Sequence, residues 1–211
     1  MNPARRREHL PQCWPWSRWI GRVLLALLGW KVEGRAPPVN RAVVIACPHT
    51  SNWDYFYALL AGWVLGISFQ WIGKDSLFRP PLGILLRLLG GIGVDRSAPQ
   101  GFVAAVAERF RTEQRLLLMV PAEGTRAYRN YWKSGFYFIA HEANVPIILG
   151  FLDFSRKIAG FGPAVNATGD IAADMDVIRA FYADKAGKHP RAKGRIRLRN
   201  EDEPGQHPQE R

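Results

Sequence analysis

Residues 43–60, VVIACPHTSNWDYFYALL, have the pattern of a strand followed by a turn and a helix. The apolar run 43–47 has the length and the β-branched content of a buried strand. Pro48 ends it, because proline cannot donate to a strand ladder. A second apolar run follows Ser51 and Asn52, two residues of the kind preferred at the start of a helix. The stretch therefore predicts a strand that turns sharply into a helix.

Runs of the same two kinds continue along the chain. Strands are expected at residues 43–47, 69–72, 116–120 and 146–154. Helices are expected at residues 52–65, 82–89, 101–111 and 135–144. This alternation predicts an α/β fold, a single domain with a mixed, mostly parallel sheet flanked by helices. We expect the domain to occupy residues 31–199 and to be followed by a disordered tail at 200–211.

The composition is that of a basic globular protein. Hydrophobic residues make up 47% of the 211-residue chain and charged residues 22%, and the formal net charge is +11. Such a charge indicates an anionic partner: a nucleic acid, an acidic membrane surface, or a phosphorylated or CoA-type substrate. Two cysteines, Cys13 and Cys47, are too few for a disulfide framework, which favours a reducing location that faces the cytoplasm.

The first 30 residues are predicted to form a basic, tryptophan-rich helix that lies in a membrane interface. Their apolar residues recur at spacings of three and four, and arginines surround that face. Tryptophan at the headgroup level and arginine beside anionic lipid are typical of such helices. The expected membrane contacts are Trp14, Trp16, Trp19, Leu24 and Leu27. No segment reaches the roughly 20 apolar residues that cross a bilayer.

A second apolar segment punctuated by arginines spans residues 77–89. Its Phe78 is a further expected membrane contact, although the pattern fits a core-facing segment equally well. From 185 to 199 the chain carries seven Lys and Arg residues and no acidic residue. This basic segment is expected to strengthen attachment to an anionic surface by roughly 1 kcal/mol for each residue held near it.

His49 and Asp54 are candidates for an acid–base pair. On one continuous helix, residues five apart would be rotated by about 140°, so the pair requires His49 in the turn and Asp54 in the first helical turn. The carboxylate would then fix the tautomer of the imidazole and leave its other nitrogen free to take a proton. The alternative is that Ser51 and Asp54 form a capping box and His49 is an ordinary loop residue.

Two loops have the composition of phosphate-binding turns. Residues 90–96, GGIGVDR, combine glycines with a terminal arginine, and residues 121–126, PAEGTR, follow an expected strand directly. Glycine allows backbone N–H groups to approach an anion, threonine adds a hydroxyl donor and arginine offers a planar fork. The alternative for each loop is a common glycine-rich turn with a solvated arginine.

The order of these segments resembles the glycerolipid acyltransferases typified by 1-acyl-sn-glycerol-3-phosphate acyltransferase. Residues 49–54, HTSNWD, resemble the H-x-S-x-x-D motif of that family, and GIGVDR at 91–96, EGTR at 123–126 and VPI at 145–147 resemble its later blocks. Lys74 and Lys133 also fall where the family commonly has lysine. One departure is Ala122, which stands before Glu123 where the family usually has proline.

The resemblance implies an O-acyltransferase in which His49 is the general base and Asp54 orients it. The implied substrate-binding residues are Lys74, Arg96, Glu123, Gly124, Thr125, Arg126 and Lys133. It implies no metal and no cofactor, with acyl-CoA or acyl-carrier protein as the co-substrate. We expect transfer to a lysolipid, most simply 1-acylglycerol-3-phosphate to give phosphatidic acid, at the cytoplasmic face of a membrane by a peripheral or monotopic protein.

Two alternatives remain open at this point. One is an acyltransferase for a different lysolipid, such as a lyso-amino-acid lipid of the ornithine type, which lacks the glycerol phosphate. The other is a non-catalytic membrane-binding protein. Nucleic-acid binding is not expected, because it gives no reason for four acyltransferase blocks in order, and the sequence says nothing about oligomeric state.

Overall fold

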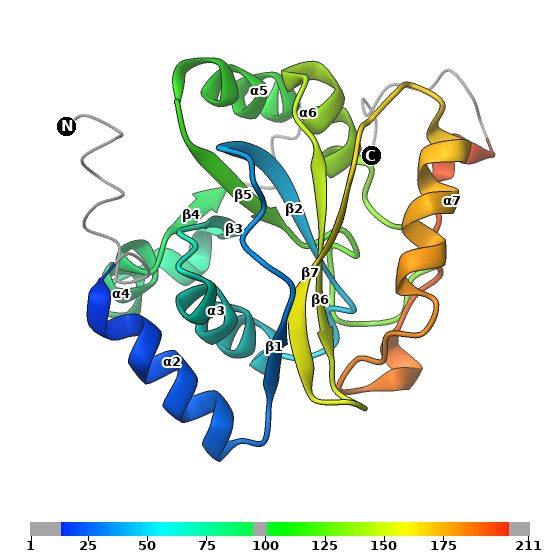
Figure 1. The fold of residues 1–211 in the computed structure, drawn as a ribbon. Coiled ribbons are helices and arrows are strands. Elements are labelled where there is room, and N and C mark those ends of the chain that lie inside the picture. The colour runs from blue at the N-terminus through cyan, green and yellow to red at the C-terminus, as the bar shows by residue number, and fades with distance from the viewer. Residues whose placement is uncertain (1–13, 95–100, 203–211) are drawn as a thin grey trace.

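The structure of the chain is a computed structural model that describes residues 14–94 and 101–202 (Figure 1). Seven strands in this part form one sheet. They are β1 (Lys31–Glu33), β2 (Arg41–Cys47), β3 (Gln70–Lys74), β4 (Gly91–Val94), β5 (Leu116–Val120), β6 (Ile147–Asp153) and β7 (Ile158–Val165). The four expected strands are β2, β3, β5 and β6, and each expected boundary lies within two residues of the observed one.

The strands lie in the order β1-β7-β6-β2-β5-β3-β4. Five neighbouring strands, from β6 to β4, run parallel to one another. The hairpin between β6 and β7 is antiparallel, and β1 runs parallel to β7 at the edge. The prediction of a single α/β domain with a mixed, mostly parallel sheet is confirmed.

Helices cover both faces of this sheet (Figure 1). They are α2 (Pro15–Leu27), α3 (Trp53–Leu65), α4 (Leu82–Leu88), α5 (Phe102–Thr112), α6 (Gly135–Ala143) and α7 (Ile171–Tyr182). Short 3₁₀ turns add η2 (Asp75–Phe78), η3 (Pro190–Ala192) and η4 (Arg199–Glu201). The four expected helices are α3, α4, α5 and α6, whereas β1, β4, β7 and α7 were not among the expected strands and helices.

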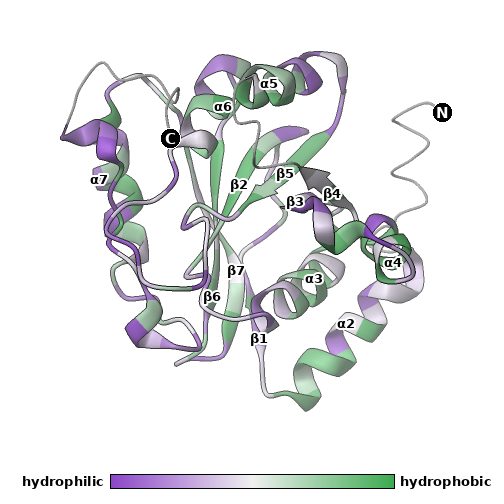
Figure 2. Ribbon diagram, turned by 180° about the vertical axis from the view of Figure 1, so that it is seen from behind, coloured by the Kyte–Doolittle hydropathy of each residue, from purple (hydrophilic) through white to green (hydrophobic). Residues whose placement is uncertain are grey.

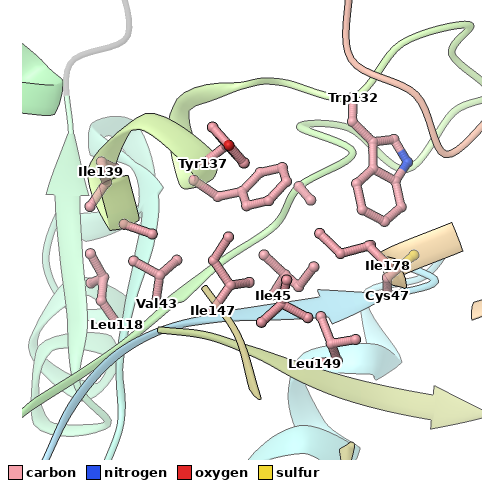
Figure 3. Close-up of a cluster of buried hydrophobic side chains, with 14 of the residues drawn as sticks. Val43, Ile45, Cys47, Leu118, Trp132, Tyr137, Ile139, Ile147, Leu149 and Ile178 are labelled. Carbon is pink, nitrogen blue, oxygen red and sulfur yellow. The ribbon is translucent and has the colours of Figure 1, made fainter. Parts of the chain in front are cut away.

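The main core lies between the sheet and the layer of α5, α6 and α7. Alternate residues of a strand point to opposite faces, so Val43, Ile45 and Cys47 of β2 face this layer and are buried (Figure 3). Ala42 and Val44 face the other side, where a smaller cluster lies. Helices α2 and α3 pack there, beside β6 and β7.

The predicted N-terminal helix is α2, and one side of it belongs to the folded domain. A Cβ at Gly21 would meet the carbonyl oxygen of Leu60 in α3 at 2.9 Å, and Leu25 is buried at the same contact. Leu24 is half-buried there. The other expected contacts are exposed by 37–78%, and they are Trp14, Trp16, Trp19 and Leu27. Within residues 14–94 and 101–202, no helix is long and apolar enough to cross a membrane.

The expectation that Phe78 contacts a membrane is wrong. Its side chain is only 2% exposed, because glycines of β3 and β4 make room for the ring. A Cβ at Gly91 would lie 2.5 Å from the ring, and one at Gly73 or Gly93 would lie 3.0 Å from it. The large apolar side chains that this segment does expose are Leu77, Leu82, Ile84, Leu85 and Leu88. Figure 2 shows apolar residues along both α4 and α2.

The folded chain continues past the predicted boundary at residue 199. Residues Arg199–Glu201 form η4, and a carboxylate oxygen of Glu201 accepts a hydrogen bond from Arg179 of α7 at 2.7 Å. The first residues of the expected disordered tail are therefore folded against α7, which the sequence did not reveal. Residues 203–211 lie outside the described part of the chain, as do residues 1–13 of the predicted interfacial helix.

Candidate active site

Two loops meet at the carboxyl ends of β2 and β5. These strands are parallel neighbours, and Ile45 pairs with Val120, so the turn 48–52 lies beside the loop 121–126. The helix that follows β2 packs on one face of the sheet, and the helix that follows β5 packs on the other. In open α/β sheets such a switch point is the crevice where ligands bind.

The His49 imidazole lies against the Asp54 carboxylate, with 3.1 Å between Nδ1 and Oδ2. Asp54 lies in the first turn of α3 and is buried. Its Oδ2 also accepts the backbone N–H groups of Thr50 and Ser51, each at 2.8 Å. The carboxylate therefore holds both the histidine and the backbone of the turn that precedes α3. The alternative of a capping box is not realised, because the N-cap residue is Asn52 and Oγ of Ser51 accepts the N–H of Trp53, at 3.2 Å, and not that of Asp54. Pairing through Nδ1 leaves Nε2 for a substrate hydroxyl, and 28% of the His49 side chain is exposed.

Glu123 fixes the same turn from the other strand. Its Oε1 accepts the backbone N–H of His49 at 2.8 Å and the thiol of Cys47 at 3.1 Å. The side chain is 3% exposed, and this burial raises the pKa of Glu123, although the two donors oppose the shift. Its Oε2 is buried without a hydrogen-bond partner among the described residues. Glu123 therefore orders the loop that carries His49.

The rest of the EGTR segment follows a tight turn. Gly124 has a positive φ of 68°, and a Cβ there would lie 2.7 Å from Cγ of Lys133. The backbone N–H of Lys133 donates to the carbonyl of Ala122 at 2.8 Å, which brings this lysine to the loop. Thr125 is half-buried and Arg126 is exposed. The structure thus groups these expected substrate-binding residues with His49.

A comparison with known protein families identifies the family of the chain. The sequence model described as Acyltransferase matches residues 29–148, which include every element of the site described so far. The chain belongs to the Acyltransferase family. Within the match lie the His49–Asp54 pair, the EGTR loop and the first residues of β6.

Two plant enzymes are similar in sequence to this member of the Acyltransferase family. The 1-acyl-sn-glycerol-3-phosphate acyltransferase of Limnanthes douglasii is 29% identical over 152 residues, which are 64% of this chain and 53% of that protein. The same-named enzyme of Limnanthes alba is 28% identical over 152 residues, with the same shares. The chain thus spans about half the length of the curated relatives it matches.

A solved structure has the same fold. The crystal structure of the 1-acyl-sn-glycerophosphate (LPA) acyltransferase PlsC from Thermotoga maritima superposes with a TM-score of 0.58 at 16% identity. The superposition covers 80% of this chain and 77% of PlsC. At that identity the likeness speaks for the shared α/β architecture alone.

The second block of the acyltransferase motifs differs from expectation. We expected its glycines to approach an anion, but Gly91 and Gly93 pack on the Phe78 ring, and a Cβ at Gly90 would meet the carbonyl oxygen of Phe69 at 2.5 Å. Lys74 is exposed at the end of β3, paired in register with Val94. Arg96 lies outside the described residues, so its role stays a prediction.

Sequence reasoning missed two features of the site. One is the Cys47 thiol, which faces Glu123 and not His49. The other is the segment after α7, where the backbone N–H of His189 donates to Oγ1 of Thr50 at 3.1 Å. Only the run of basic residues from 185 to 199 marked this segment in the sequence, and that run was interpreted as a membrane attachment. No local pattern relates residue 189 to residue 50.

Proposed function

We propose that this member of the Acyltransferase family transfers an acyl group from a thioester donor to the free hydroxyl of a lysolipid. The observation that carries the proposal is the distance of 3.1 Å between Nδ1 of His49 and Oδ2 of Asp54, at the carboxyl end of a central parallel strand. A buried carboxylate that pairs with one imidazole nitrogen is the arrangement of a general base.

The reaction requires one proton carrier. Nε2 of His49 takes the proton of the acceptor hydroxyl while the oxygen attacks the thioester carbonyl carbon. The C–S bond of the tetrahedral intermediate then breaks, and the imidazolium gives its proton to the leaving thiolate. The products are an ester and a free thiol. Asp54 stabilises the imidazolium, and general base catalysis of this kind contributes about 10²- to 10⁴-fold in rate.

The acceptor that we propose is 1-acylglycerol-3-phosphate, which would become phosphatidic acid. Three features support an acceptor with a phosphate: the net charge of +11, the exposed cations Arg126 and Lys133 at the EGTR loop, and the similarity to the two 1-acyl-sn-glycerol-3-phosphate acyltransferases of Limnanthes. The donor would be acyl-CoA or acyl-carrier protein, without a metal or cofactor.

We propose further that the protein acts on the cytoplasmic leaflet of a membrane. Exposed Trp16, Trp19 and Leu27 of α2 support contact with the bilayer, and Arg18 and Arg22 on the same helix support anionic lipid. Drawing a lipid chain into water costs about 0.8 kcal/mol for each CH₂ group. An enzyme that rests on the leaflet avoids that cost.

The test is an assay of the purified protein beside a His49→Ala variant. Labelled acyl-CoA and acyl-carrier protein would serve as donors, with lysophosphatidic acid and a lyso-ornithine lipid as acceptors. We expect transfer to lysophosphatidic acid by the wild-type protein and none by the variant.

Other outcomes would contradict parts of the proposal. Transfer to the phosphate-free acceptor alone would make the phosphatidic acid assignment wrong while keeping the acyltransferase. Equal transfer by wild type and variant would remove His49 as the base. Vesicle binding without any transfer would favour a non-catalytic membrane-binding protein.

A further inference from the structure

The chain after α7 lies against the catalytic motif. We name residues 186–191 the C-terminal strap. Its carbonyl group at Ala186 accepts the N–H of Phe154 at 2.8 Å, and its N–H at His189 donates to Oγ1 of Thr50 at 3.1 Å. The strap is therefore attached on one side to the end of β6 and on the other to the residue next to His49.

Gly187 fixes how closely the strap approaches. A Cβ at this buried position would lie 2.7 Å from Oγ1 of Thr50, 2.8 Å from its Cγ2 and 3.2 Å from Cβ of Pro48. Contacts under 3.0 Å do not occur between such atoms, so only glycine permits this packing. The residue that follows, Lys188, is thereby held at the motif.

The lysines of this region have different tasks. Nζ of Lys193 donates to the carbonyls of Tyr182 and Lys185, each at 2.8 Å, and Nζ of Lys185 contacts Asp184 at 2.6 Å. Both ammonium groups are used within the protein. Lys188 is exposed, and the one contact of its Nζ among the described residues is with the ring of Trp53, at 5.0 Å from the centroid.

This contact places an unpaired positive charge at the catalytic motif. Trp53 lies between His49 and Asp54 in sequence and is 52% exposed, so the ammonium and the ring are both accessible. In the part of the chain that the structure describes, Lys188 has no carboxylate within ion-pair distance. The two carboxylates at the site, Asp54 and Glu123, are buried and already accept hydrogen bonds.

We propose that Lys188 binds a phosphate group of one of the two substrates. A lysine ammonium is a compact point charge that suits a phosphate oxygen, and a cation held on an aromatic ring loses little freedom when it binds. The phosphate belongs either to the CoA part of the donor or to the acceptor headgroup. The inference rests on the proposed acyl transfer, because it names a contact made by a substrate of that reaction.

The test compares Lys188→Gln with Arg115→Gln, which removes an exposed charge at the opposite edge of the sheet, before β5. The donors are acyl-CoA and the phosphate-free acyl-N-acetylcysteamine, and the acceptors are 1-acylglycerol-3-phosphate and 1-acylglycerol. We expect Lys188→Gln to raise the KM of one phosphate-bearing substrate about tenfold and to leave its phosphate-free analogue unchanged. An effect on acyl-CoA assigns the donor phosphate, and an effect on 1-acylglycerol-3-phosphate assigns that of the acceptor. Lys188→Arg retains the charge and should restore most of the affinity.

The inference would be overturned if Lys188→Gln had the same KM values as Arg115→Gln. It would also be overturned if the KM of Lys188→Gln rose equally for substrates with and without a phosphate. If the wild-type protein transfers no acyl group, the proposed function is wrong. The phosphate contact of Lys188 is then tested by measuring ligand binding without catalysis. Titration calorimetry with CoA and with glycerol 3-phosphate would then be done on wild type and Lys188→Gln. Weaker binding of either compound by the variant supports the phosphate contact, whereas equal binding or no binding by wild type overturns it.

Discussion

The Cys47 thiol donates a hydrogen bond to Oε1 of Glu123 across 3.1 Å, from the last residue of β2 to the loop after β5. The same oxygen accepts the backbone N–H of His49. Burial raises the pKa of the Cys47 thiol, so the sulfur keeps its proton and acts as a donor. Glu123 therefore connects the end of one strand to the turn that carries the proposed base.

Replacing Glu123 by Ala should loosen this turn. The variant leaves the buried donors of Cys47 and His49 without their acceptor, and an unpaired buried donor costs about 1–3 kcal/mol of unfolding free energy. We expect a loss in that range in urea denaturation, together with a lower kcat because His49 is less well positioned. Glu142→Ala, an exposed glutamate of α6, is the control. Equal stability of the two variants would contradict the role assigned to Glu123.

The raised pKa of Glu123 predicts a dependence of stability on pH. A carboxyl group whose pKa in the folded state exceeds its ordinary value of 4.5 binds its proton more tightly when folded. Its contribution to stability is fully present below that value and is lost as pH rises through the folded pKa. Glu123→Gln keeps an oxygen acceptor but cannot titrate. We expect the unfolding free energy of wild type minus that of the variant to fall as the pH rises above 4.5. A difference that stays flat or rises would contradict the shift.

Two substitutions separate the electrostatic role of Asp54 beside His49 from its role as a hydrogen-bond acceptor for the turn. Asp54→Asn keeps an oxygen for the N–H groups of Thr50 and Ser51 but removes the charge that stabilises the imidazolium. We expect transfer to slow about 10²- to 10⁴-fold. Asp54→Ala should slow it as much and also lower the unfolding free energy by about 1–3 kcal/mol, because the buried N–H groups of Thr50 and Ser51 lose their acceptor. The acyl-transfer rate and the urea denaturation of both variants would be measured and compared with those of the wild-type protein. Near-normal transfer by Asp54→Asn would show that the side chain of Asp54 only holds the turn before α3.

The parts of the site that the sequence predicts are those encoded locally. The run 43–47, Pro48 and the capping residues specify a strand, a turn and a helix start within a dozen residues. These suffice to bring His49 and Asp54 together. The contact of Cys47 with Glu123 depends on the register of β2 against β5, which joins residues 76 apart in sequence. Periodicity in a single segment carries no such information.

Phe78 shows the same limit. Its neighbours in sequence are apolar and basic, so the local pattern suits a membrane contact. Its burial is decided by glycines at 73, 91 and 93, which leave space for the ring on two adjacent strands. Gly91 and Gly93 were expected to approach an anion and Phe78 a lipid, whereas the two glycines pack against the phenylalanine ring.

Exposed apolar residues of α2 give a test of membrane contact. We expect a variant with Trp16→Ser, Trp19→Ser and Leu27→Ser to lose sedimentation with anionic vesicles and to keep its unfolding free energy. Val177→Ser and Tyr128→Ser, which change exposed side chains elsewhere, form the control. Substitution is preferable to removal of residues 1–30, because that would also take away buried Leu25 and Trp30. Unchanged sedimentation of the triple variant would exclude this face of α2 as the contact.

Gly187 allows the position of the C-terminal strap to be tested without changing its charge. In Gly187→Ala the new methyl group would lie 2.7 Å from Oγ1 and 2.8 Å from Cγ2 of Thr50. Overpacking of this kind costs about 1–3 kcal/mol. Thr50→Ala removes both of those atoms, so the cost of Gly187→Ala should be smaller in that background. A double-mutant cycle of unfolding free energies would show coupling between the two positions if the strap packs on the motif in solution. Additive effects would mean that it does not, and Lys188 would then have no fixed place beside Trp53.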